Sequence, residues 1–104
     1  MIRIEEYVSE GSSPFRRWFN DLDTQAAASV TVAIERLAEG NTSNVKPVGE
    51  GAAELKINRG PGYRIYYGKH GDNVILLLCG GTKNDQWRDI KKAKALFEKW
   101  KTSK

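Results

Sequence analysis

The side chains with the clearest capacity for chemistry are basic and lie in the second half of the chain. Residues 1–52 hold 5 Lys and Arg against 8 Asp and Glu, whereas residues 53–104 hold 12 against 5, so the two halves contribute −3 and +7 to the net charge of +4. Arginine suits phosphate because its planar fork binds two oxygens at once. This polarity predicts one basic face, which is typical of proteins that bind nucleic acid, although a solvated lysine-rich surface gives the same counts.

The bend Gly60-Pro61-Gly62 decides which side chains share that face. A three-residue loop that pairs Arg59 with Tyr63 keeps the apolar residues of both flanking strands on one face, whereas a two-residue loop would mix them with polar residues. We therefore expect a sheet face that is polar, aromatic-bearing and open for a ligand. Its members are Glu54, Lys56, Asn58, Arg64 and Tyr66.

Lys83 follows Gly80-Gly81, where a strand is expected to give way to a helix. Glycines without side chains would let a phosphate approach the backbone, and a helix N-terminus adds a favourable dipole. Clustered cations favour the neutral form of a lysine, because like charge disfavours the charged form. Either Lys56 or Lys83 is therefore a candidate general base.

The elements that must position these residues follow from periodicity and capping. A strand over residues 1–8 precedes a helix that begins at Ser13-Pro14, with serine as the N-cap and proline at the first helical position. The remaining elements are a second helix capped by Asp23 or Thr24 and ending near Glu39, a loop over Asn41–Ala52, two strands around the glycine–proline bend, a fully apolar central strand over Val74–Cys79, and a last helix opened by a Thr82–Asp85 capping box.

The predicted order is βααβββα, an α+β fold in which an antiparallel meander packs on an N-terminal helical hairpin, with a C-terminal helix. A chain of 104 residues is one domain, residues 1–104. No apolar run approaches the roughly 18 residues that a membrane helix needs, the first ten residues lack a secretory apolar core, and the one cysteine cannot form an internal disulfide. These features favour a cytoplasmic protein without membrane contact.

Two long segments resemble a known superfamily: ELKINRGPGYRIYY, and LLLCGGTKNDQWRDIKKAKALF. With SPFRRWFNDL near the start, they make the chain similar to the RelE/ParE toxins, and most similar to the phage-derived, HigB-like addiction-module killer proteins. The resemblance implies a RelE-like fold and a bacterial type II toxin that cleaves mRNA, usually on the ribosome, and is silenced by a helix-turn-helix antitoxin. Within the same superfamily, ParE-like proteins poison DNA gyrase instead. A third possibility is a nucleic-acid-binding module without toxicity.

RNA cleavage without a metal or cofactor uses the 2′-hydroxyl of the RNA as nucleophile, so the protein must orient the phosphate, transfer protons and neutralise charge. Arg64 is the first choice for holding the phosphate. The candidate catalytic residues are Arg64, Lys83, Lys56 and Arg88, the last to stabilise the transition state or assist the leaving group. The candidate RNA-binding residues are Arg59, Tyr66, Lys91 and Lys92, with Tyr66 offering a ring for an unstacked base.

Structural roles compete with each of these assignments. Arg64 could pair with Glu54 across the sheet, and Tyr66 could be packing. His70 lies at a turn tip without a second histidine, and Cys79 lies in an apolar strand, which is typical of buried filler. The aspartates are too scattered for a metal cluster, and Gly80-Gly81-Thr82-Lys83 lacks the spacing of a phosphate-binding P-loop.

Overall fold

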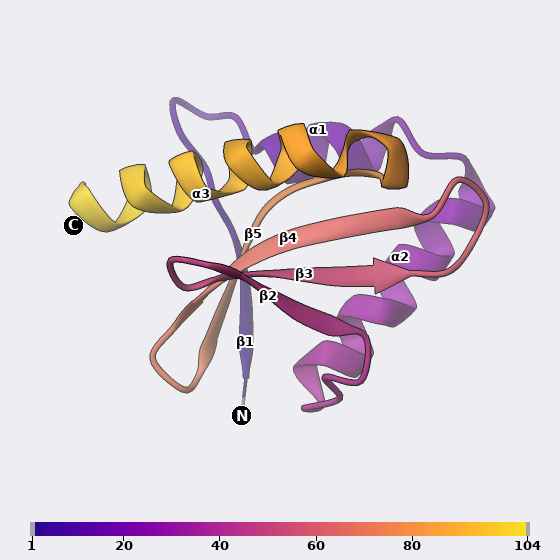
Figure 1. Ribbon diagram of the computed structural model, residues 1–104, viewed down its shortest axis with the longest axis horizontal. Coiled ribbons are helices and arrows are strands. Elements are labelled where there is room, and N and C mark those ends of the chain that lie inside the picture. Colours follow the sequence, from indigo (N-terminus) through magenta and orange to yellow (C-terminus); the bar gives the residue numbers. More distant parts are fainter. Residues whose placement is uncertain (1, 104) are drawn as a thin grey trace.

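The computed structural model describes residues 2–103 as a sheet with helices on both of its faces (Figure 1). In chain order the elements are β1 (Arg3–Glu6), α1 (Pro14–Asn20), α2 (Thr24–Ala38), β2 (Val45–Gly49), β3 (Ala52–Ile57), β4 (Tyr63–His70), β5 (Val74–Thr82), a 3-10 turn (Lys83–Asp85) and α3 (Gln86–Thr102). No helix among these residues is long and apolar enough to cross a membrane.

The sheet is five-stranded and mixed, in the order β1-β5-β4-β3-β2. Strands β3, β4 and β5 pair antiparallel in succession as predicted, and β1 adds to β5 in parallel. The segment expected to be a loop over Asn41–Ala52 instead contains strand β2, which pairs antiparallel with β3. The glycine and proline content of β2 is typical of a loop, which is why the sequence did not predict a strand there. An edge strand tolerates Pro47 because one side of its backbone needs no sheet partner.

The predicted starts of the first two helices are confirmed. Ser13 Oγ accepts a hydrogen bond from the Arg16 N–H at 3.0 Å, and Asp23 Oδ1 accepts one from the Ala26 N–H at 2.8 Å. The capping box expected at Thr82 is wrong, because no side-chain cap hydrogen bond opens the 3-10 turn or α3. The chain enters α3 through the 3-10 turn instead.

The β3–β4 register differs from the expected one by two residues. Ile57 pairs with Tyr63 and Lys56 with Arg64, so the connection spans residues 58–62 rather than the three residues of the glycine–proline bend. A shift by two preserves which side chains share a face, since strand side chains alternate with a period of two. Lys56, Arg64 and Tyr66 therefore still share a face, as the hydrophobic pattern required.

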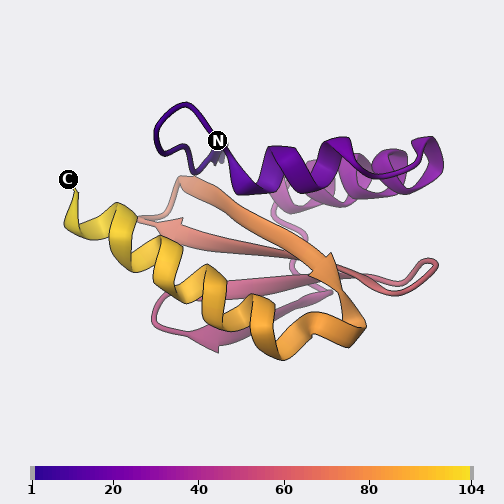
Figure 2. The same ribbon diagram turned by 90° about the horizontal axis from the view of Figure 1, so that it is seen from above.

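Helices cover both faces of the sheet (Figure 2). Each face has its own apolar core. Ile75 and Leu77 of β5 pack with Phe15 and Val30 on the side of α1 and α2, while Leu76 packs on the other side beneath α3. The prediction of a central strand covered on both faces is confirmed for β5. The face that carries Arg64 is the one beneath α3, so the expectation of an open polar sheet face is wrong.

The double glycine does not end β5, as the sequence suggested, but lies within it, at a point where both faces of the strand are crowded. A Cβ at Gly80 would overlap the indole ring of Trp18 from α1, and a Cβ at Gly81 would overlap the Asp89 carboxylate from α3. Both glycines are therefore required for close helix approach. The expected space for a phosphate against this bare backbone is occupied by Trp18 and Asp89.

Candidate functional site

The β3–β4 connection and the residue that follows β5 enclose a hollow of about 400 Å³, here called the basic basin. Among the described residues that line it none is acidic; they are Lys56, Asn58, Arg59, Gly60, Pro61, Gly62, Arg64 and Lys83. Four candidate residues from the sequence are thereby brought together. They are Lys56, Arg59, Arg64 and Lys83.

Backbone hydrogen bonds hold the rim of the basic basin. The Lys83 N–H donates to the Gly62 carbonyl at 2.8 Å, and the Gly62 N–H donates to the Arg59 carbonyl at 2.9 Å. Gly62 has φ of 77°, in the left-handed region that a side chain rarely adopts. The glycine after Pro61 thus lets the loop fold back against the start of the 3-10 turn, which fixes Lys83 beside it.

Arg64 forms the floor of the basin and is only 4% exposed. Its Nε lies 3.8 Å from Glu54 Oε1, and its Nη1 donates to the Tyr63 carbonyl at 3.3 Å. The Nε–H has no hydrogen-bond partner, although it is buried. The cross-strand pairing with Glu54 that competed with a functional role is therefore present. It also holds the guanidinium in one orientation, with an edge toward the basin.

Glu54 is buried at the centre of a polar cluster behind Arg64. Its Oε2 accepts hydrogen bonds from the Tyr66 hydroxyl at 3.1 Å and from Gln86 Nε2 at 2.8 Å. Burial raises the pKa of Tyr66, and the neighbouring Glu54 carboxylate raises it further, so the phenol stays a hydrogen-bond donor. Sequence reasoning placed Glu54 on this face but did not foresee that Gln86 reaches it from α3.

Tyr66 is 0% exposed and cannot offer its ring to a nucleobase. The expected stacking role is wrong because α3 covers this face, and the ring packs with Leu76, Cys79 and Phe97. Burial also raises the pKa of the Cys79 thiol to about 12, consistent with its expected role as filler.

The remaining predicted residues lie outside the basin. The Arg88 guanidinium is exposed and pairs with Asp85 at 3.3 Å and Asp89 at 3.7 Å, while Lys91 and Lys92 are exposed further along α3. Trp87, in the first turn of α3, is 79% exposed, and Lys91 Nζ lies 5.7 Å from the centre of its ring.

Asp89 is the second buried carboxylate of this region. Its Oδ2 packs against Gly81 without a hydrogen-bond partner, and burial raises its pKa above the usual value. Within residues 2–103, no three histidine, cysteine, aspartate or glutamate side chains are grouped as metal ligands would be. The arrangement suits the binding of a polyanion, since four cationic residues line the basin and no described acidic residue does.

Two comparisons relate the chain to known proteins. Residues 17–99 match the family described as phage derived protein Gp49-like (DUF891). An uncharacterized protein of Haemophilus influenzae is 40% identical over 85 residues, which is 81% of this chain and 86% of that protein. The matched span runs from α1 to the last turns of α3 and so includes every residue that lines the basic basin. The chain therefore belongs to the phage-derived Gp49-like family.

Proposed function

We propose that this protein is the toxin of a type II toxin–antitoxin pair, with a RelE-like fold, and that it arrests growth by cleaving mRNA on the ribosome. Two facts support the proposal: the Gp49-like family is associated with toxin–antitoxin modules, and cations converge in a basin that no described acidic residue lines. The second is the observation that carries it. A phosphodiester in that basin meets positive charge from several directions, which is what cleavage of RNA requires.

The proposed reaction is an in-line displacement at phosphorus. The 2′-oxygen of the RNA bonds to phosphorus as the bond to the 5′-oxygen of the next nucleotide breaks, which leaves a 2′,3′-cyclic phosphate and a free 5′-hydroxyl. One group takes the proton of the 2′-hydroxyl, and another protonates the departing 5′-oxygen. No metal or cofactor is needed for this step.

Residue roles follow from position in the basin. Arg64 and Lys83 hold the phosphate and stabilise its developing charge, since one lies on the floor and the other on the rim. Lys56 and Lys83 are the candidates for the general base, because both line the basin. Whichever of them is the base is neutral before the reaction and leaves the charge on the phosphate to Arg64 and the other lysine. The lysine that is not the base then protonates the leaving oxygen. Arg88 is a weaker candidate for that step, since its charge is shared with Asp85 and Asp89 outside the basin.

The partners in this proposal are mRNA on the ribosome and a cognate helix-turn-helix antitoxin. An antitoxin that silences the site must offset the positive charge of the basin, so we expect an acidic segment to cover it. Co-purification of toxin and antitoxin tests this pairing. Elution of the mixture at the positions of the separate proteins would contradict it.

The function is tested with Lys83→Gln, because the side chain is exposed and its loss leaves the core intact. Lys69→Gln is the matched control, an exposed lysine of β4 that does not line the basin. Induced expression of the natural protein should stop growth and produce new RNA 5′ ends. We expect Lys83→Gln to lose about 10²-fold or more of the cleavage rate, as for loss of a group that stabilises a transition state, and Lys69→Gln to behave as the natural protein.

The same experiment separates the alternatives. Growth arrest with a DNA-damage response and intact transcripts would identify a ParE-like gyrase inhibitor. Normal growth with salt-dependent binding to RNA or DNA would identify a non-toxic binding module. Either result refutes the proposed endoribonuclease.

A further inference from the structure

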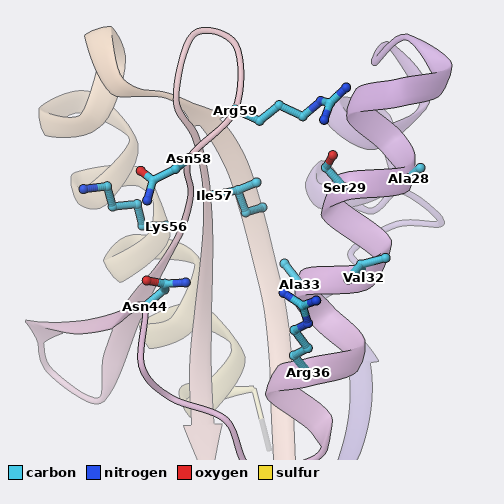
Figure 3. A pocket seen from close by; sticks show the side chains of 10 residues that line it. All are labelled: Ala28, Ser29, Val32, Ala33, Arg36, Asn44, Lys56, Ile57, Asn58 and Arg59. Carbon is cyan, nitrogen blue, oxygen red and sulfur yellow. The ribbon is translucent and has the colours of Figure 1, made fainter.

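A second hollow of about 400 Å³ adjoins the basic basin on the side of α2 (Figure 3). Here it is called the α2 groove. It lies between α2 and the end of β3, and it shares Lys56, Asn58 and Arg59 with the basin. The two hollows therefore meet at the last residues of β3 and the start of the β3–β4 connection, and one extended ligand can occupy both.

The α2 groove exists because β2 stops short of the end of β3. Their pairing ends at Val45 and Leu55, and beyond it the Lys56 N–H donates to the Asn44 carbonyl at 3.0 Å. Ile57 therefore extends beyond the last paired residue of the edge strand. On the opposite wall, α2 presents small side chains at Ala28, Ser29 and Ala33, which leave the space unfilled.

Arginines stand at the two ends of the groove. Figure 3 shows Arg59 reaching toward α2 at one end and Arg36 at the other, while Lys56 points away from α2. Arg59 is held in place because its Nη2 donates to Gln25 Oε1 at 3.1 Å. Arg36 is exposed, and among the described residues that line the groove none is acidic. The lining thus favours an anion, as in the basin.

Between the arginines the lining is partly apolar and partly amide. Val32 is 42% exposed on α2 and faces the groove together with Ile57, while Asn44 and Asn58 supply amide groups. An apolar surface beside hydrogen-bonding groups suits a nucleobase, whose faces are apolar and whose edges carry donors and acceptors. A hollow of this size is within the roughly 300–1,000 Å³ of small-molecule sites.

We propose that the α2 groove binds a nucleotide of the same single-stranded RNA, next to the phosphate held in the basic basin. The inference rests on the proposed function and adds to it a second binding site on the substrate. The base lies against Val32 and Ile57 with its edge toward Asn44, and the phosphate of that nucleotide pairs with Arg36. Cleavage in the basin then depends on the identity of a neighbouring base as well as on the phosphate.

The test measures binding of the full-length protein to a hexaribonucleotide with 2′-O-methyl groups, which cannot be cleaved by attack of the 2′-oxygen. Fluorescence anisotropy reports affinity without any requirement for activity. Arg36→Gln removes the charge, and Ser29→Trp fills the groove without changing charge, because the Ser29 side chain lies on the side of α2 that faces β3 (Figure 3). Arg17→Gln is the matched control, because it removes an exposed arginine on α1, outside both hollows.

We expect Arg36→Gln to weaken binding about tenfold, which is the effect of losing one charge-assisted hydrogen bond. The slope of log affinity against log salt concentration should fall by about one, because one phosphate contact is lost. Ser29→Trp should weaken binding similarly with the salt slope unchanged, and Arg17→Gln should change affinity by less than about twofold. Circular dichroism confirms that each variant is folded.

Two outcomes overturn the inference. In the first, Arg36→Gln and Ser29→Trp bind the RNA as the natural protein does while Lys83→Gln binds it poorly, so that only the basin holds RNA. In the second, the groove variants keep RNA affinity and lose the antitoxin, so that the groove belongs to the protein partner. Conversely, groove-dependent RNA binding without any RNA cleavage in cells would refute the endoribonuclease and leave the groove as a nucleotide site.

Discussion

Replacing Arg64 with methionine separates the structural role of this residue from its proposed role in binding phosphate. The side chains of Arg64 and Glu54 are 5% and 4% exposed, so the substitution leaves a buried carboxylate without its cation. Removal of one partner of a buried pair typically costs 3–5 kcal/mol, and we expect about 3 kcal/mol here. The lower end applies because the Nε–Oε1 distance is 3.8 Å and Glu54 keeps its hydrogen bonds from Tyr66 and Gln86.

The second variant combines Arg64→Met with Glu54→Gln. A neutral amide still accepts hydrogen bonds from Tyr66 and Gln86 and removes the unpaired charge, so about 2 kcal/mol of the loss should return. Urea unfolding followed by circular dichroism measures the free energy of unfolding of each variant. The two variants are compared at the same dependence of that free energy on urea concentration. The double variant should nevertheless fail to bind or cleave RNA, because the basin has lost the cation on its floor.

Two results would refute this reasoning. If the free energy of unfolding of Arg64→Met lies within about 0.5 kcal/mol of that of the natural protein, the buried ion pair with Glu54 does not stabilise the fold. If the double variant is stable and cleaves RNA at the natural rate, Arg64 is structural and the phosphate is held elsewhere.

Further predictions concern the double glycine, the buried carboxylate and the thiol. Gly81→Ala should destabilise the protein by about 2 kcal/mol, since its Cβ overlaps the Asp89 carboxylate, and Gly81→Ala with Asp89→Ala should be more stable than Gly81→Ala alone in urea unfolding. Burial raises the pKa of Asp89 above 3.8, so its contribution to stability is fully present below pH 3.8 and is lost as pH rises through the folded value; Asp89→Asn should remove that part of the pH dependence. Because the pKa of Cys79 is raised to about 12, the thiol should not react with a disulfide reagent at pH 8 until the protein is unfolded.

Local chemistry explains which parts of the fold could be read from the sequence. The side chains of Ser13 and Asp23 cap their helices by accepting hydrogen bonds from backbone N–H groups three residues ahead, so no distant segment is needed to specify them. The meander and the interior position of β5, between β1 and β4, follow from hydrophobic runs and turns. The grouping of Lys56, Arg59, Arg64 and Lys83 at one site was anticipated in part, because alternation along a strand assigns faces even when the register is displaced by two.

The edge strand and the polar cluster show what local patterns do not contain. Strand β2 has no hydrophobic alternation of its own and forms because β3 offers an unpaired edge. Gln86 and Glu54 are 32 residues apart in the sequence, and neither local segment contains a pattern that predicts their hydrogen bond. Both features depend on where distant elements come to lie.

Local patterns along the chain specify the types of most elements, the starts of the first two helices and the set of side chains that share a face of β3 and β4. That α3 covers this face, so that Tyr66 is buried and Arg64 is paired with Glu54, becomes evident in the folded molecule alone. The two kinds of feature differ in the range of the interactions that produce them. Backbone alternation and capping act within a few residues, whereas the choice of face for a helix depends on which apolar surfaces of the finished sheet remain to be buried.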